Sequence, residues 1–134
     1  MQVQPYLFLE GRCQEAIDFY HHALGASVVM QMAYKDSPVP TGQSPETGDK
    51  IMHACLRIGE TEVFMSDGRC GGAPVFQGFA LSLALTDDVE AARVFAALAD
   101  GGSVNMPLGK TFFASSFGMV NDRFGVAWMV MVQG

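Results

Sequence analysis

Basic side chains are scarce in this sequence. Eight Lys and Arg residues stand against fourteen Asp and Glu residues, which gives the 134-residue chain a formal net charge of -6. Nucleic acids and anionic membrane surfaces attract proteins through clusters of positive charge. We therefore expect neither a nucleic acid nor a membrane as a partner.

Long apolar runs are also absent. The longest, at residues 126–132, has the length of a strand and falls far short of the ~20 residues that cross a bilayer. Met1 is followed by the polar residues Gln2 and Gln4, without a basic stretch or an apolar segment, so we expect no signal peptide and a cytoplasmic protein. The length of 134 residues predicts one domain, and the 49% of hydrophobic residues predicts a folded chain rather than a disordered one.

Cysteine is too rare for a disulfide framework. Cys13, Cys55 and Cys70 make an odd number, and no C-x-x-C motif is present. This usage is typical of a reduced protein. We interpret the three residues as small buried hydrophobic side chains.

Hydrophobic spacing and turn residues predict the same order of elements twice. Apolar residues at three- and four-residue steps predict helices at 13–24 and 89–99, with Gly25 ending the first and Asp87 and Asp88 opening the second. Strand patterns are expected at 3–9, 27–34, 50–58 and 61–67, then at 79–86, 103–108, 111–120 and 126–132.

This βαβββ order, repeated, predicts an α+β fold. We expect a single domain over residues 1–134, with module one at 1–68, a glycine-rich linker at 69–78 and module two at 79–134. One such unit has too little core to be stable alone, so two must join. The long segment 35–49 holds three prolines and is expected to be a loop that can act as a lid.

Four motifs in this order resemble a known family. They are PYLF at 5–8, EAIDFY at 15–20, IMHA at 51–54 and DRFGVAW at 122–128. The chain resembles the PhnB-like branch of the vicinal oxygen chelate superfamily, which includes glyoxalase I, bleomycin resistance proteins and extradiol dioxygenases. The resemblance implies two βαβββ modules with curved mixed sheets around a cavity, in a homodimer. Members often carry a demethylubiquinone methyltransferase label, but no strand here leads through a G-x-G-x-x-G turn into a helix.

The resemblance also implies where a divalent metal would bind. In metal-dependent relatives, His, Glu or Gln side chains come from the first and last strands of each module. The matching positions here are Pro5, residues 64–66, residues 79–85, and Trp128 or Met129, and they lack these ligand types. We therefore expect no metal and no cofactor.

Without a metal site, we expect an apolar pocket with few polar groups, which is the usual composition of a small-molecule site. His53 is the candidate catalytic acid or base, because histidine is the residue type most often used for proton transfer near neutral pH. Strand alternation allows only half of the residues of each strand to face the pocket. Most of the Phe and Met candidates can alternatively be explained as core residues. The candidate ligand-binding residues are Phe8, Met52, His53, Met65, Phe113, Ser115, Phe117 and Trp128.

Three functions follow from this sequence. The first is a metal-free protein that binds a planar or aromatic small organic molecule, as the bleomycin-sequestering members of the superfamily do. The alternative is an enzyme of the lyase, isomerase or transferase type that uses a divalent metal or His53. The third is a dimeric scaffold whose cavity is filled by its own side chains.

Overall fold

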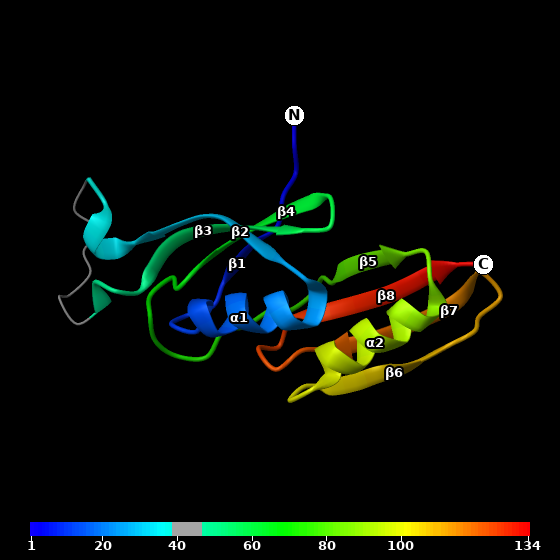
Figure 1. Ribbon diagram of the computed structural model, residues 1–134. Coiled ribbons are helices and arrows are strands. Elements are labelled where there is room, and N and C mark those ends of the chain that lie inside the picture. Colours follow the sequence, from blue (N-terminus) through cyan, green and yellow to red (C-terminus); the bar gives the residue numbers. More distant parts are fainter. Residues whose placement is uncertain (39–46) are drawn as a thin grey trace. The chain divides into compact units, whose positions relative to one another are not determined.

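The computed structural model describes residues 1–38 and 47–134, and the chain divides into two compact units, Met1–Pro74 and Val75–Gly134 (Figure 1). Each unit holds one helix and one four-stranded mixed sheet. This is the α+β fold that the sequence predicts. Among the described residues, neither helix nor any other helical segment is long and apolar enough to cross a membrane.

Unit 1 places its strands in the order β1-β4-β3-β2, with β1 parallel to β4 and the other neighbours antiparallel. Helix α1 lies along one face of this sheet (Figure 1). The elements are β1 (Tyr6–Phe8), α1 (Cys13–Leu24), β2 (Ser27–Ala33), the short 3-10 helix η1 (Tyr34–Asp36), β3 (Ile51–Ile58) and β4 (Thr61–Ser66).

Helix α1 has the bounds that the sequence predicts. Its apolar face is buried, including Ile17 and Tyr20, and Glu15 in the first turn and two histidines in the last turn suit the helix dipole. Gly25 ends the helix with φ 70°, and its N–H donates to the carbonyls of His21 and Tyr20. This left-handed conformation favours glycine, which explains the stop.

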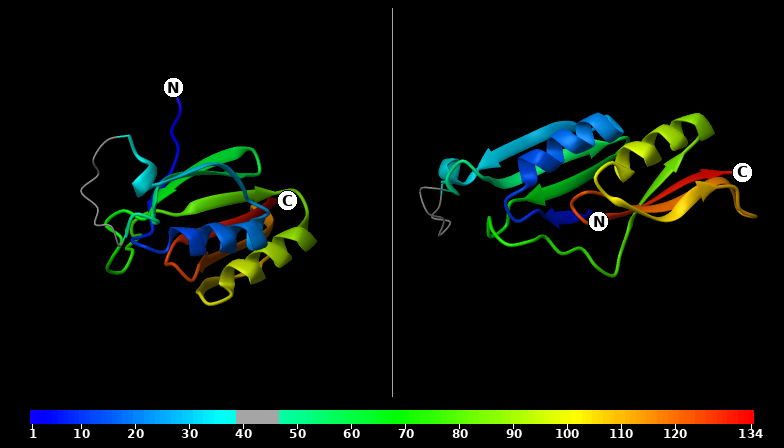
Figure 2. Two further views of the ribbon diagram at one scale, coloured as in Figure 1. Left: turned by 60° about the vertical axis from the view of Figure 1, so that its left-hand side comes forward. Right: turned by 90° about the horizontal axis from the view of Figure 1, so that it is seen from below.

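Unit 2 repeats the topology, with its strands in the order β5-β8-β7-β6 and β5 parallel to β8. Figure 2 shows α2 along one face of this second sheet. The Asp87 side chain accepts the N–H of Val89 and caps the helix, as the sequence predicts. The elements are β5 (Leu81–Leu85), α2 (Asp88–Ala99), β6 (Ser103–Gly109), β7 (Ala114–Asn121) and β8 (Ala127–Gln133).

Alternation fixes the two faces of the second sheet. Alternate residues of β7 and β8 are buried toward α2, among them Gly118, Val130 and Trp128. Gly118 has no room for a side chain: a Cβ there would lie 2.7 Å from the ring of Phe95 and 2.9 Å from the Cα of Leu108. The close approach of helix and neighbouring strand therefore depends on glycine at this position.

Several predicted strand ends differ from the structure, and the starts of β1 and β7 differ most. Strand β1 spans only Tyr6–Phe8, although the carbonyl of Pro5 still accepts the N–H of Phe64. Strand β7 begins at Ala114 rather than at residue 111, because Thr111 Oγ1 accepts two backbone N–H groups and closes a turn there. Of the predicted loop 35–49, residues 39–46 lie outside the described residues.

The two ends of that segment are joined to each other. The N–H of Tyr34 donates to the carbonyl of Lys50 over 3.0 Å, and the N–H of Lys35 donates to the carbonyl of Gly48 over 2.9 Å. Lys35 also forms an ion pair with Asp49, at 2.5 Å. The extension of β2 and the start of β3 are thus held together by backbone and side-chain contacts.

Candidate functional site

Four rings gather on the face of the first sheet that is opposite to α1, and we call them the aromatic face: Tyr6, Phe8, His53 and Phe64. The Tyr6 ring is stacked on Phe8 with centroids 5.0 Å apart. It also lies 5.5 Å from His53 and 6.0 Å from Phe64, and His53 and Phe64 are 5.4 Å apart. These spacings fall within the range of favourable aromatic contacts.

Strand pairing brings the rings together. Tyr6 pairs with Phe64 across the parallel β1–β4 ladder, and β3 is the other neighbour of β4. Successive residues of a strand point to opposite faces, so Leu7 and Met65 point the other way and are buried in the core. The aromatic face therefore depends on the same alternation that builds the core beneath it.

The aromatic face contains one polar pair. The hydroxyl oxygen of Tyr6 lies 2.8 Å from Nδ1 of His53. Burial raises the pKa of the Tyr6 hydroxyl, with Tyr34 adding to the effect, so Tyr6 keeps its proton at neutral pH. An apolar surface with one hydrogen-bonded pair is suited to hold and orient a ring-containing molecule.

Two of the rings are accessible. Phe8 is 53% exposed and Tyr6 is 40% exposed, although both are large aromatic side chains.

Phe8 and His53 are the two predicted ligand-binding residues that the structure brings onto the aromatic face. Tyr6 and Phe64 were not predicted, because their meeting depends on the register between strands that are distant in the sequence.

Other predicted residues of unit 1 lie elsewhere. Met65 is fully buried on the α1 side of the sheet. Met52 is half-buried and directly precedes His53 in β3, at a register shift in the pairing of β3 with β2. Neither side chain belongs to the aromatic face.

In unit 2 the predicted residues also separate. Phe113 and Phe117 pack edge to face with centroids 5.1 Å apart. Ser115 instead donates to the Asp88 carboxylate over 2.7 Å, next to Ser116, which donates to the same oxygen over 2.6 Å. These two bonds lower the pKa of Asp88 below its usual range, with the Ser116 bond as the larger cause.

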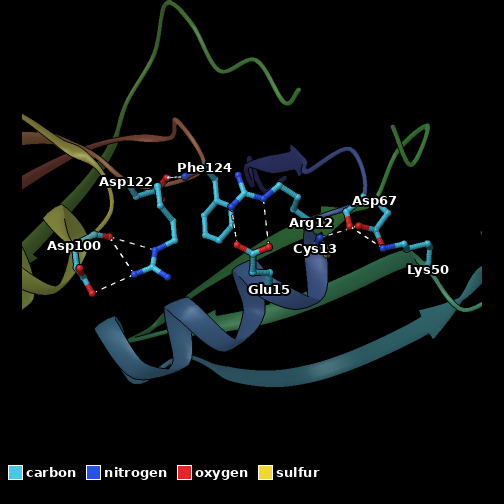
Figure 3. A network of polar contacts seen from close by, with 10 residues as sticks. Arg12, Cys13, Glu15, Lys50, Asp67, Asp100, Asp122 and Phe124 are labelled. Carbon is cyan, nitrogen blue, oxygen red and sulfur yellow. Dashed lines mark hydrogen bonds and ion pairs between the residues drawn. The ribbon is translucent and has the colours of Figure 1, made fainter. Parts of the chain in front are cut away.

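Trp128 has the polar partner that a buried indole needs. Its Nε1–H donates to Asp122 Oδ2 over 2.9 Å, and Asp122 Oδ1 accepts the N–H groups of Phe124 and Val126. Figure 3 shows Asp122 beside Phe124 at this turn. Trp128 is 2% exposed and packs on the α2 side, so its ring belongs to the core of unit 2.

Asp67 is a second buried carboxylate, and sequence reasoning missed its role. Its Oδ1 accepts the N–H of Cys13 over 2.7 Å, and its Oδ2 accepts the N–H of Ile51 over 2.6 Å. Figure 3 shows it beside Cys13 at the first residue of α1. Asp67 therefore joins the end of β4 to the starts of α1 and β3.

The three thiols are poorly suited to act as nucleophiles. Burial is the main cause that raises the pKa of each thiol. A nearby carboxylate adds to the effect: Asp67 beside Cys13 and Cys70, and Glu62 beside Cys55. A raised pKa leaves little thiolate at neutral pH, and the thiolate is the reactive form.

The side chains at the strand pairs do not fit the divalent metal that the resemblance implies. The carbonyl of Pro5 accepts the N–H of Phe64, and Ser82 pairs with Met129 on β5 and β8. The side chains of proline, phenylalanine, serine and methionine do not provide the imidazole and carboxylate donors of such a site. Within residues 1–38 and 47–134, no three His, Cys, Asp or Glu side chains lie close enough to hold a metal ion.

The two βαβββ units define the class of protein. A glyoxylase/bleomycin resistance protein/dioxygenase domain from Frankia sp. EAN1pec has a similar fold, with a TM-score of 0.65 and 17% identity over 99% of this chain and 95% of that chain. At this identity the likeness shows the fold alone. The fold is the glyoxalase-like fold of the vicinal oxygen chelate superfamily.

Proteins of higher sequence identity indicate the family within this class. Protein YjdN of Escherichia coli (strain K12) is 36% identical over 142 residues, an alignment that covers 98% of this chain and 95% of that protein. Protein PA1353 from Pseudomonas aeruginosa is 44% identical with a TM-score of 0.87, covering 99% of this chain and 98% of that chain. A PhnB protein from Bacillus cereus is 25% identical with a TM-score of 0.82, covering 98% and 99%.

A family model described as 3-demethylubiquinone-9 3-methyltransferase matches residues 1–131. The chain belongs to this family, the PhnB-like branch of the superfamily, and the resemblance drawn from the four sequence motifs is confirmed.

Proposed function

We propose that this protein binds a planar aromatic organic molecule on the aromatic face of unit 1, without a metal ion. The observation that carries the proposal is the set of four rings on one sheet face, with the hydrogen-bonded Tyr6 and His53 among them and Phe8 half exposed. A flat apolar ligand can stack on these rings, and the polar pair can orient it.

The affinity expected from such a surface is modest. Aromatic contacts contribute about 0.5–1.5 kcal/mol each beyond the burial of area. A rigid two-ring probe has about ten heavy atoms, and at roughly 0.4–0.5 kcal/mol per atom its Kd falls between about 0.2 and 1 mM. The physiological ligand is expected to be larger and to bind more tightly.

Saturation-transfer NMR with naphthalene and coumarin tests the proposal, because both are planar two-ring molecules. We expect both probes to bind the full chain and the Phe8→Ala variant to weaken both. Phe112→Ala is the matched control: Phe112 is fully exposed in unit 2, so its loss removes the same side chain without touching the aromatic face. Equal affinity of wild type and Phe8→Ala, or failure of both probes to bind wild type, refutes the proposal.

The methyltransferase activity in the family model's description is not part of this proposal. A dinucleotide-like cofactor is held by a glycine-rich turn from a strand into a helix. Here β1 reaches α1 through the sequence LEGR, and β5 reaches α2 through a short turn that ends at the Asp87 cap. The homodimer that the resemblance implies and the cytoplasmic location expected from the sequence remain predictions.

A further inference from the structure

We infer that His53 presents its Nε2–H to the ligand, so that the aromatic face selects planar molecules that carry a hydrogen-bond-accepting oxygen at their edge. Carbonyl and phenolate oxygens are acceptors of this kind. The inference rests on the proposed function and adds to it a chemical class of ligand and a residue that determines specificity.

The first step is the tautomer of His53. A neutral imidazole has one N–H donor and one bare nitrogen that accepts, and the hydrogen bond at one nitrogen decides which nitrogen carries the proton. Tyr6 lies 2.8 Å from Nδ1. A phenol is a stronger acid than a neutral imidazole N–H, and an imidazole nitrogen is a stronger base than a phenol oxygen. Tyr6 therefore donates to Nδ1, and the proton of the imidazole lies on Nε2.

The second step is the availability of Nε2. Within the described residues, the only side-chain hydrogen bond of His53 is the one between Nδ1 and Tyr6. In the same part of the chain no buried side-chain nitrogen or oxygen lacks a partner. His53 Nε2 is therefore not buried, and its N–H points to a position that solvent or a ligand can reach.

The third step is the orientation of the ring. The imidazole forms a triangle with the Tyr6 and Phe64 rings, whose centroids are 5.5 Å and 5.4 Å from it and 6.0 Å from each other. Turning it over would exchange Nδ1 for a carbon and lose the bond to Tyr6. A donor held in this way, beside rings on which a ligand stacks, can discriminate among ligands, since only those with an acceptor at the right edge satisfy it.

Nitrogen-15 NMR of the unliganded protein at pH 8 measures the tautomer directly. The His53 signals are assigned by their loss in His53→Phe. We expect His53 in wild type to carry its proton on Nε2, and Tyr6→Phe, which keeps the ring but lacks the hydroxyl, to show a mixture of both tautomers. A wild-type His53 protonated on Nδ1 overturns the inference.

Binding of coumarin and naphthalene measures the selectivity. The two probes are similar in shape, but only coumarin has a carbonyl oxygen. The preference for coumarin, expressed as a ratio of Kd values, is expected to fall about two- to tenfold in His53→Phe, because one net hydrogen bond contributes a factor of this size. In Tyr6→Phe the preference is expected to fall by a smaller factor. His22→Gln, at the exposed end of α1, is the control and is expected to keep the wild-type ratio.

The outcomes separate the two proposals. If both probes bind at the aromatic face but His53→Phe leaves their ratio unchanged, the inference is overturned and the proposed function stands. If neither probe binds wild type, both are overturned. If His53→Phe fails to fold, the ratio in Tyr6→Phe decides, because that variant keeps both rings.

Discussion

Replacing Asp122 with Asn is expected to destabilise unit 2, because the amide NH2 group adds a hydrogen-bond donor where the buried N–H groups need an acceptor. The carboxylate is 3% exposed and uses both oxygens: one for the N–H groups of Phe124 and Val126, the other for the indole N–H of Trp128. An amide has only one oxygen. In either orientation its NH2 group faces a buried donor.

The size of the effect follows from these bonds. A buried polar group left unsatisfied costs about 1–3 kcal/mol, and more where a charged acceptor is lost. We expect Asp122→Asn to lower the free energy of unfolding by about 2–4 kcal/mol. Trp128→Phe removes the indole donor, so in that background the amide oxygen can serve the two backbone N–H groups without conflict. The cost of Asp122→Asn should then be smaller by about 1–2 kcal/mol.

Urea unfolding of the four proteins of this double-mutant cycle, followed by far-UV circular dichroism, measures the coupling. Asp100→Asn is the matched control, because Asp100 is largely exposed and its ion pair with Arg123 spans 3.2 Å. Such a pair contributes about 0–1 kcal/mol. A coupling energy of zero, or equal losses for Asp122→Asn and Asp100→Asn, would refute the reasoning.

Two further predictions concern unit 2. Gly118→Ala is expected to cost about 1–3 kcal/mol in urea unfolding, because the new Cβ meets the ring of Phe95 and the backbone of β6; unchanged stability would contradict the close contact. Ser116→Ala is expected to raise the pKa of Asp88 toward its usual value of about 3.9 in a carbon-13 NMR titration. Because the pKa of Asp88 is depressed in the folded protein, the ionised carboxylate contributes to the free energy of unfolding above about pH 4. This contribution is lost as the pH falls through the pKa of Asp88 in the folded protein. Acidification should therefore cost the Ser116→Ala variant less of its stability than wild type.

The helices were the most predictable part of the fold. Their signals are local: the three- and four-residue spacing of apolar side chains, Gly25 after α1 and Asp87 before α2 all act within a turn or two. The doubled order of elements followed from these signals and from the strand patterns between them. The strand ends were less predictable, because a side-chain bond such as that of Thr111 decides them.

The candidate site was only partly predictable, and the reason is register. Phe8 and His53 were named from their residue types, but their neighbours Tyr6 and Phe64 meet through a parallel pairing across 58 residues of sequence. Trp128 was also named as a ligand-binding residue, but the structure places it in the core of unit 2. The run that holds it is apolar at every position through Val132, so no alternation in the sequence distinguishes the two sides of β8.

The pinned ends of segment 35–49 have a consequence for how this protein tolerates change. Tyr34 and Lys35 are bonded to Lys50, Gly48 and Asp49, and Asp67 separately anchors the first amide of β3. The register of β2 against β3 is thus held at this end of the sheet by several bonds rather than by one. A substitution that removes one of these bonds leaves the others in place, so the two strands are expected to keep their register.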